Sequence, residues 1–288
     1  MFKVSVIIPT YNRQKSLINA VDSVFNQSIL PHEIIVVNDG DENKAIEALR
    51  LKAMETNCLI ILNTKGSEGG NVARNIGACY ATGDILMFLD DDDSWDKEKI
   101  AKQLDVFETN SSIGLVYSNR NVVDSNGKIV RKITGYREGN IYPDIFFNNY
   151  IGGTSSVAIR KNIFMSVDMF DEKLPALQDF DLWIRICKIT LVGLDKSYSV
   201  NYAIAENYSN QVTGSLEKKK IAVNHIIEKY KVHISQLNLF HKRKLFSKLY
   251  LSLARSARGQ DYKTCFKYSL KSFFSYPNFR SLFFIIGI

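Results

Sequence analysis

Four consecutive carboxylates follow an apolar segment in the first third of the chain. The segment LMFLDDDDSW, residues 86–95, places Asp90, Asp91, Asp92 and Asp93 directly after residues typical of a buried strand. Neighbouring carboxylates raise one another's pKa and repel, so the run is unfavourable unless solvent or a cation compensates it. It therefore predicts either a solvated turn or a site for a hard divalent cation, which prefers oxygen ligands.

Two further segment ends carry side chains that could bind a nucleoside. Pro9, Thr10 and Tyr11 end the first apolar segment, and the tyrosine offers a flat face on which a base could stack. Asp39 follows the second apolar segment and could accept a hydrogen bond from a ring N–H, such as that of uracil. Asp39 could equally serve with Gly40 as a cap for the next helix.

A glycine-rich loop and a second acidic motif complete the set of candidates. The loop GSEGG, residues 66–70, leads into a helix that carries Arg74 and could receive phosphate, although its spacing is neither GxGxxG nor that of a Walker motif. The motif QDFDLWIR, residues 178–185, places Asp179 at the start of an amphipathic helix. A carboxylate is favoured there by the helix dipole, so Asp179 is either a catalytic group or an ordinary N-terminal residue.

Alternating strands and helices must position these residues. Apolar runs predict strands at residues 4–10, 33–37, 58–63 and 84–89, with helical patterns between them. Continuous apolar strands separated by helices are typical of a parallel sheet that is covered on both faces, which makes this an α/β fold. Ligands of such sheets bind beyond the carboxyl ends of the strands, so PTYN, VNDGD and LDDDD are expected on one rim.

The pattern changes along the second half of the chain. Strand-like runs around Asp124–Gly127 predict a hairpin, and YIGGTSSVAIR, residues 150–160, predicts a small-residue loop followed by a strand. Beyond Ser215 the sequence is helical. We therefore expect an α/β domain over residues 1–214 and a helical C-terminal region over residues 215–288.

Composition separates these two parts further. The 288 residues are 45% hydrophobic, enough for a sizeable core, and four scattered cysteines are expected to be buried thiols in a reducing compartment. The N-terminus has no secretory-signal pattern, so a cytoplasmic protein is expected. Residues 215–288 hold 15 Lys and Arg against 3 Asp and Glu, a charge of +12, which leaves −5 for the rest of a +7 chain.

Taken together, the motifs resemble those of the family 2 glycosyltransferases, which have the GT-A fold, a Rossmann-like, mostly parallel sheet flanked by helices. The resemblance covers about residues 3–190. It is carried by VSVIIPTYNR, IIVVNDGD, GGNVARNIGACYATGDILMFLDDDD and QDFDLWIR, which are specific jointly and not singly. It implies a nucleotide-sugar donor, a divalent cation (Mn²⁺ or Mg²⁺) and inversion at the anomeric carbon.

The resemblance also implies roles for individual residues. Asp39 corresponds to the base-recognising aspartate, Pro9, Thr10 and Tyr11 to the strand end that lines the nucleoside pocket, and Asp179 to the catalytic base. The run from Asp90 to Asp92 supplies the family's DxD element. Asp92 is its foremost metal ligand and Asp90 the second candidate, while Asp90 or Asp91 faces the ribose.

This chain departs from the family pattern at two positions. Asn38 stands where an aspartate commonly precedes Asp39, and Gln178 stands where a glutamate commonly precedes the base. These departures are the support for one alternative, a catalytically silent module that binds nucleotides or carbohydrates. A nucleotidyltransferase is a second alternative, disfavoured because PTYNRQKSL leads into an amphipathic helix where that class places a basic, glycine-rich loop.

The expected reaction is transfer of a sugar, from a donor that is most simply UDP-linked, to a hydroxyl of a glycan or lipid-linked glycan. Capsule, O-antigen and exopolysaccharide assembly are processes of this kind.

The basic C-terminal region suggests a partner of its own. Its Lys and Arg residues are interleaved with aromatic residues, and the final run SLFFIIGI is far shorter than the roughly 20 residues that span a bilayer. Charge and aromatic content are compatible with peripheral attachment to an anionic membrane. The resemblance implies this attachment at the cytoplasmic face, because many enzymes that the chain resembles extend lipid-linked glycans there. The alternative is that these helices pack on the α/β domain with their lysines in water. Nucleic acid is not expected as a partner, because no motif for it is present.

Overall fold

The computed structural model describes residues 2–203 and 215–286, which form two compact units. Among the described residues, the first unit contains 2–142, 150–172 and 182–203. The second contains 143–149, 173–181 and 215–286. The second unit therefore includes two short segments from the middle of the sequence as well as the C-terminal helices.

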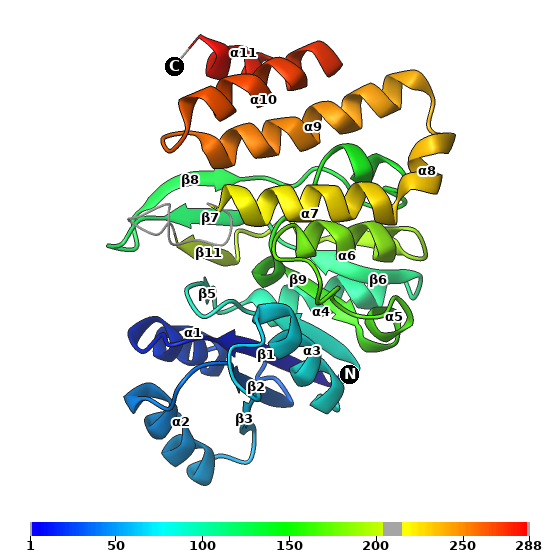
Figure 1. Ribbon diagram of the computed structural model, residues 1–288. Coiled ribbons are helices and arrows are strands. Elements are labelled where there is room, and N and C mark those ends of the chain that lie inside the picture. The colour runs from blue at the N-terminus through cyan, green and yellow to red at the C-terminus, as the bar shows by residue number, and fades with distance from the viewer. Residues whose placement is uncertain (1, 204–214, 287–288) are drawn as a thin grey trace. The chain divides into compact units, whose positions relative to one another are not determined.

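A seven-stranded sheet forms the centre of the first unit (Figure 1). Its strands are β1 (Val4–Thr10), β2 (Glu33–Asn38), β3 (Leu59–Asn63), β4 (Ile85–Phe88), β6 (Ile113–Tyr117), β9 (Val157–Arg160) and β10 (Leu191–Leu194). Their order is β10-β6-β9-β4-β1-β2-β3, and only β9 runs antiparallel to its neighbours. The expected mostly parallel α/β fold is confirmed.

Alternate residues of the strands face two different layers of helices. Val6 and Ile8 of β1 belong to one core with the apolar residues of α1 (Lys15–Phe25), α2 (Lys44–Glu55) and α4 (Lys99–Thr109). The residue between them, Ile7, faces α3 (Gly70–Tyr80) on the opposite side. A side chain at Gly77 of α3 would meet Ile7 Cγ2 at 2.6 Å, so this glycine sets how closely α3 packs on the sheet. Fully buried strands of this kind explain the continuous apolar runs in the sequence.

A second sheet of four strands completes the first unit. It consists of β5 (Ser94–Trp95), β7 (Arg120–Val123), β8 (Ile129–Ile133) and β11 (Val200–Ala203), in the order β5-β11-β7-β8. The expected hairpin around Asp124–Gly127 is confirmed, because β7 and β8 pair antiparallel across it. The parallel pairing of β11 with β7 joins segments about 80 residues apart, and no local pattern predicts it.

Three shorter helices follow in the sequence: the 3₁₀-helix η2 (Thr154–Ser156), α5 (Lys161–Ser166) and α6 (Gln178–Cys187). The helices η2 and α5 belong to the first unit, and α6 is divided between the two units. Residues 178–181 of α6 belong to the second unit and residues 182–187 to the first. The apolar residues Phe180, Trp183, Ile184 and Cys187 of α6 are all buried, as its sequence pattern predicts.

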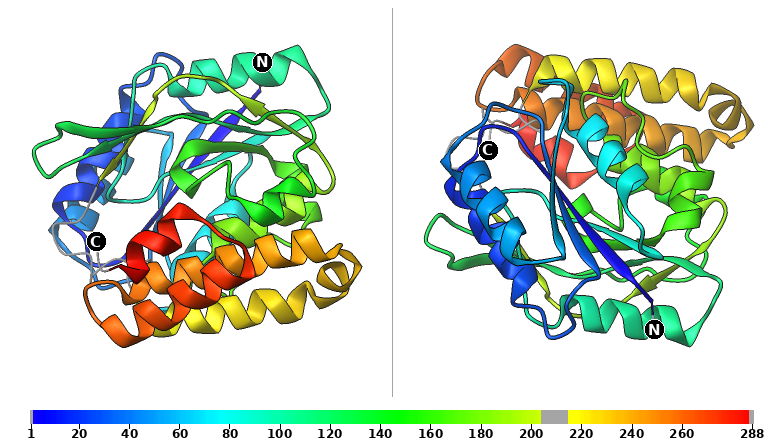
Figure 2. Two further views of the ribbon diagram at one scale, coloured as in Figure 1. Left: turned by 90° about the horizontal axis from the view of Figure 1, so that it is seen from above. Right: turned by 90° about the horizontal axis from the view of Figure 1, so that it is seen from below.

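The C-terminal region is helical over its described residues, as expected. Its helices are α7 (Leu216–Lys229), α8 (Lys231–Gln236), α9 (Leu239–Ala257), α10 (Tyr262–Ser275) and α11 (Phe279–Ile285), and the second unit also holds the 3₁₀-helix η1 (Asp144–Phe147). Figure 2 shows α9, α10 and α11, coloured from orange to red, packing against one another. None of the described helices is long and apolar enough to cross a bilayer.

The cysteines differ in part from expectation. Cys187 and Cys265 are buried, but Cys79 is exposed and Cys58 is only partly covered. Cys79 lies on α3 one residue beyond the buried Ala78, so the helix turns its side chain away from the sheet. The prediction of four buried thiols was therefore wrong for Cys79.

Candidate active site

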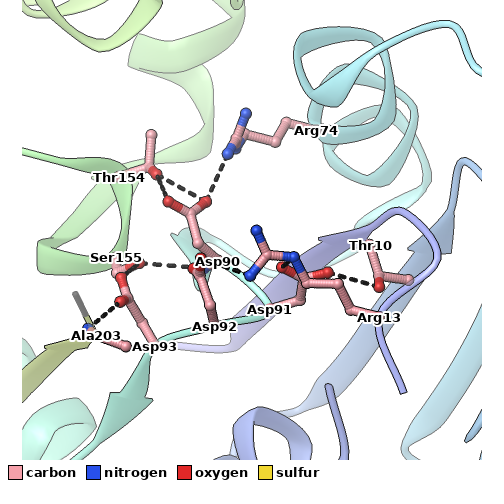
Figure 3. Close-up of polar contacts among 10 residues, drawn as sticks. All are labelled: Thr10, Arg13, Arg74, Asp90, Asp91, Asp92, Asp93, Thr154, Ser155 and Ala203. Atoms are coloured by element: carbon pink, nitrogen blue, oxygen red, sulfur yellow. Dashed lines mark hydrogen bonds and ion pairs between the residues drawn. The ribbon is translucent and has the colours of Figure 1, made fainter. Parts of the chain in front are cut away.

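The carboxyl ends of β1, β2 and β4 meet at one rim, and two hydrogen bonds join them. The backbone N–H of Asp39, after β2, donates to the carbonyl oxygen of Thr10 over 2.9 Å. The Thr10 hydroxyl donates to Asp91 Oδ2 over 2.7 Å, which links β1 to the segment after β4 (Figure 3). The predicted convergence of PTYN, VNDGD and LDDDD is therefore present, although these motifs lie as much as 81 residues apart.

The acidic run divides into two buried and two accessible carboxylates. Asp91 and Asp93 are buried, whereas Asp90 and Asp92 are partly exposed. A turn in which the Asp93 N–H donates to the carbonyl oxygen of Asp90 over 3.0 Å gives the segment this alternation. Only Asp90 and Asp92 therefore remain within reach of a ligand.

Two arginines compensate the accessible carboxylates. Arg13 donates from Nη1 to Asp92 Oδ2 over 2.7 Å, and its Nε lies 3.5 Å from Asp91 Oδ1. Arg74, on α3, donates from Nη2 to Asp90 Oδ1 over 2.5 Å. Arg74, which follows the glycine-rich loop, therefore lies at the rim. Arg13 was missed as a candidate, although it stands directly after PTYN in the motif VSVIIPTYNR.

The segment before β9 supplies hydroxyl groups to the same run. Thr154 Oγ1 donates to Asp90, 3.1 Å from both carboxylate oxygens. The Ser155 hydroxyl donates to Asp93 Oδ2 over 2.6 Å and accepts the backbone N–H of Asp90 over 3.1 Å. Because β9 is antiparallel to β4, its first residues lie at the end of β4, which brings this loop to the rim. Nothing in the local sequence indicated that Thr154 and Ser155 hold the carboxylates.

Burial and mutual repulsion shift the acidities of the run. Burial raises the pKa of Asp91 to about 6, against the lowering effects of the Thr10 hydroxyl and Arg13. The pKa of Asp92 is raised by burial and by the negative charge of Asp90, and burial raises the pKa of Asp93 well above its usual range. The four carboxylates therefore form a site at which additional positive charge is favoured.

The accessible carboxylates fit a hard divalent cation whose remaining ligands come from a second group. Among the described residues, no three His, Cys, Asp or Glu side chains converge as a metal site on their own. Mg²⁺ and similar ions, however, commonly bind through one or two carboxylates together with substrate phosphates. Asp90 and Asp92 offer that number of accessible oxygen-donor groups, next to each other on a crowded anionic turn.

Arg74 carries a buried donor with no partner. Its side chain is largely buried and lies against the Phe170 ring, with the guanidinium carbon 5.6 Å from the ring centroid. Its Nε has no hydrogen-bond partner among the described residues. An unsatisfied buried N–H is costly, so a phosphate oxygen that reached Nε would be bound favourably.

Asp39 holds the glycine-rich loop in place. Its carboxylate is buried and accepts the backbone N–H groups of Glu68 over 2.8 Å and Gly69 over 2.7 Å, and the Thr64 hydroxyl over 2.6 Å. A carboxylate accepts about four hydrogen bonds, so about one position remains for a base. The alternative of an ordinary helix cap is wrong, because Asn43 caps the following helix α2 by accepting from Ala45 and Ile46.

Tyr11 presents an open ring beside this loop. Its side chain is 54% exposed, and its hydroxyl accepts a hydrogen bond from Ser67 of the loop over 3.4 Å. Pro9 and Thr10 are buried within β1 beneath it. The rim therefore offers a flat aromatic face next to Asp39, with Pro9 and Thr10 supporting it from the strand.

Asp179 begins α6 and belongs to the second unit. It is partly exposed, and Asn149 Nδ2 lies 3.4 Å from its Oδ2. Its charge acts on Lys219 of α7, where burial lowers the lysine pKa and Asp179 opposes that effect. Asp179 is thus an accessible carboxylate near a buried ammonium group of the same unit.

Asp181, two residues further on, has a different environment. It is fully buried and accepts from Lys229 Nζ, 2.9 Å from Oδ1, and from the Tyr230 hydroxyl over 2.9 Å. These bonds tie α6 to the end of α7. The motif QDFD therefore contains one accessible carboxylate and one structural carboxylate.

Comparison with known proteins agrees with these features. Residues 5–174 match Glycosyl transferase family 2. The chain is 29% identical over 239 residues to the uncharacterized glycosyltransferase YwdF of Bacillus subtilis, covering 79% of this chain and 84% of that one. It is 31% identical over 195 residues to the amylovoran biosynthesis glycosyltransferase AmsB of Erwinia amylovora, covering 64% of each.

A solved structure shares the fold. The crystal structure of Staphylococcus aureus TarS residues 1–349, in complex with UDP-GlcNAc, superposes with a TM-score of 0.61 over 99% of this chain and 92% of that one, at 15% identity. The GT-A-like fold that the motifs predicted is therefore confirmed. The match to the family over more than half of the residues establishes that this chain belongs to glycosyl transferase family 2.

Proposed function

We propose that this glycosyltransferase moves a sugar from a UDP-linked donor to a hydroxyl of a glycan or lipid-linked glycan, with inversion, in the assembly of a surface polysaccharide. The observation that carries the proposal is the arrangement of Tyr11, Asp39, Arg74, Asp90 and Asp92 on one rim of the sheet. The relative AmsB is named for amylovoran biosynthesis, and the TarS structure contains UDP-GlcNAc. Both support this choice of donor and process.

The rim offers a separate group for each part of the donor. Tyr11 stacks on the uracil, and the remaining acceptor position of Asp39 binds the ring N–H. Asp91 supports the strand end by accepting a hydrogen bond from Thr10. Asp90, the accessible carboxylate that pairs with Arg74, binds a ribose hydroxyl. Arg74 Nε binds a phosphate oxygen, because it is a buried donor without a partner among the described residues.

Asp92 and Asp90 are the residues that would hold Mn²⁺ or Mg²⁺. A cation bound there supplies Lewis-acid stabilisation of the charge on the departing diphosphate. Thr154 and Ser155 keep the acidic turn in position from the opposite side, so that the two accessible carboxylates stay at the rim.

Asp179 is the proposed general base. Its accessible carboxylate takes the proton of the acceptor hydroxyl while that oxygen attacks the anomeric carbon from the face opposite the diphosphate. Positioned general bases contribute about 10²- to 10⁴-fold to rates. Asn149 orients one carboxylate oxygen, and the other accepts the backbone N–H of Phe180 over 2.7 Å.

Donor and metal binding are tested by thermal shift with UDP and Mn²⁺. The wild-type protein is expected to be stabilised by UDP only when Mn²⁺ is present, and Asp92→Ala to lose this response. A metal-dependent shift that survives in Asp92→Ala would remove Asp92 from the site. GDP in place of UDP tests the choice of nucleotide.

Transfer itself is tested by release of free UDP from a panel of UDP-sugars with glycan acceptors. Asp179→Asn is expected to lose transfer by at least about 10²-fold while its thermal shift with UDP and Mn²⁺ stays as in wild type. Near-normal transfer by this variant would exclude Asp179 as the base. A protein that binds UDP but releases none from any donor would instead be a silent binding module.

A further inference from the structure

Helix α11 carries an apolar stripe that faces outward. Phe279, Leu282 and Phe283 of the helix and Ile286, its C-terminal cap, are spaced at i, i+3, i+4 and i+7, the spacing by which a helix normally packs on a core. Here the four side chains are 81%, 41%, 50% and 57% exposed. A stripe of this kind in contact with water is unfavourable and indicates a surface that another apolar phase covers.

The other side of α11 is already packed. Ser281 is fully buried, and Phe284 packs against the small core formed by Ala254, Ala257 and Cys265. Arg258 lies over the Phe284 ring, 5.0 Å from its centroid. The helix is therefore held by its inner face, while much of its outward stripe stays in contact with water.

The helices that hold this stripe are strongly basic. Residues 238–286 contain ten Lys and Arg against one Asp, a formal charge of +9. Arg280 of α11, with Arg255 and Lys244, lowers the pKa of Lys248, although burial is the larger cause of that shift. These three cations therefore lie close enough to repel Lys248, and the cluster favours an anionic partner.

Helix α10 has the same mixture of side chains. Phe266 and Phe274 are exposed, and with Leu270, Lys267 and Lys271 they line an open hollow that also reaches Tyr250 of α9. Lys271 Nζ lies 5.6 Å from the centroid of the Tyr250 ring. Long cationic side chains next to exposed aromatic rings suit the headgroup region of a bilayer, where the ring is buried and the ammonium group stays hydrated.

We propose that α11 inserts the side chains of Phe279, Leu282, Phe283 and Ile286 into the interface of an anionic membrane, while cations of the basic C-terminal helices bind lipid headgroups. A second copy of the chain is the less suitable occupant. A symmetric contact would place two equal surfaces, each of high positive charge, against each other. This inference concerns how the protein is anchored, and it depends on neither the sugar donor nor Asp179.

The test is sedimentation of the intact protein with vesicles. Vesicles of equal parts phosphatidylglycerol and phosphatidylcholine are expected to bind the wild-type protein, more weakly as salt is added, and phosphatidylcholine vesicles to bind it poorly. The double variant Phe279→Ser/Phe283→Ser is expected to bind the anionic vesicles at least about tenfold more weakly, because two rings no longer leave water. Lys248→Gln/Arg280→Gln should reduce the preference for anionic lipid.

A matched control is available on helix α2. Leu51 and Met54 are also exposed apolar residues, so Leu51→Ser/Met54→Ser removes similar surface at a site with no proposed contact and should bind vesicles as wild type does. Because Phe279 and Phe283 are exposed, their variant should keep the wild-type unfolding temperature.

Three results would overturn the proposal. The first is an intact protein that stays in the supernatant with anionic vesicles at low salt. The second is a Phe279→Ser/Phe283→Ser variant that sediments as wild type does. The third, by light scattering, is a wild-type oligomer that this variant converts to monomer without any vesicle binding, which would assign the stripe to a second copy of the chain.

Discussion

Arg13 Nη1 donates to Asp92 Oδ2 over 2.7 Å, so the carboxylate proposed to bind a metal is already paired with a cation of the chain itself. A divalent ion at Asp92 must displace this guanidinium or share the carboxylate with it. The pair is partly exposed, so its contribution is modest, typically below about 1 kcal/mol.

Removing Arg13 should therefore strengthen metal binding in the absence of nucleotide. Arg13→Gln is expected to bind Mn²⁺ about two- to fivefold more tightly, measured from the spectrum of free Mn²⁺ by electron paramagnetic resonance. The control is Arg50→Gln, which breaks the surface pair of Arg50 with Glu42 and should leave Mn²⁺ affinity unchanged. Equal affinities in Arg13→Gln and wild type would mean that Arg13 does not compete with the metal.

Asp39→Asn should loosen the loop 64–69 as well as weaken UDP binding. Glu68 donates to Oδ1 of Asp39 and Gly69 donates to Oδ2, so an amide would present its NH₂ group, itself a donor, to one of these two N–H groups. We expect faster hydrogen exchange of these two amides and at least about tenfold weaker binding of UDP. Exchange as slow as in wild type, together with weak UDP binding, would limit Asp39 to contact with the base.

Substitution by asparagine should reduce stability at Asp181 and activity at Asp179. Asp181→Asn breaks a buried ion pair with Lys229 and is expected to lower the free energy of unfolding by about 3 kcal/mol. Asp179→Asn, at a partly exposed position, should change that free energy by less than about 1 kcal/mol while it abolishes transfer. Urea titrations of both variants provide the measurement, and equal destabilisation would contradict the division of roles.

Lys99→Met should stabilise the protein at neutral pH and flatten its pH dependence. Burial lowers the pKa of Lys99 to about 7, against 10.5 for an unperturbed lysine, so between these values the unfolded chain binds more protons and stability rises with pH. From pH 7 to 9 the wild-type protein should gain about 2 kcal/mol more than Lys99→Met does.

The hydrogen-bond partners of Lys99 keep other donors when the lysine is replaced by methionine. Its Nζ donates to the Ser118 hydroxyl and the Ser156 carbonyl oxygen, each over 3.2 Å. Both atoms also accept from Gln103 Nε2, over 2.9 Å, so neither loses its last hydrogen bond in the methionine variant. Parallel pH profiles of the two proteins in denaturant titrations would show that Lys99 does not titrate in this range.

The sequence predicts the rim well because its features are local. Each strand end follows a run of apolar residues, and parallel strands bring their carboxyl ends together whatever the length of chain between them. Strand β1 occupies Val4–Thr10, the predicted residues, for this reason.

The contacts that complete the site are not local. Thr154 and Ser155 reach Asp90 and Asp93 over a separation of more than 60 residues, through an antiparallel strand that looks like any other apolar run. The sequence indicates a membrane contact for the basic C-terminal region as a whole, but not that the α11 stripe is exposed, because its spacing is equally that of a helix packed on a core. Amphipathic spacing predicts which residues share a face, and only the three-dimensional arrangement tells whether that face is covered.

The reversed direction of β9 has a consequence for how enzymes of this shape can diversify. The pairing of Ala158 with Met87 begins just beyond the loop that ends at Ser156, so the loop can change in length or composition without altering the alignment of the strands. The same loop supplies Thr154 and Ser155 to the acidic turn. Residues 150–153 can therefore vary while the two hydroxyl-bearing residues that follow them continue to hold the acidic turn in place.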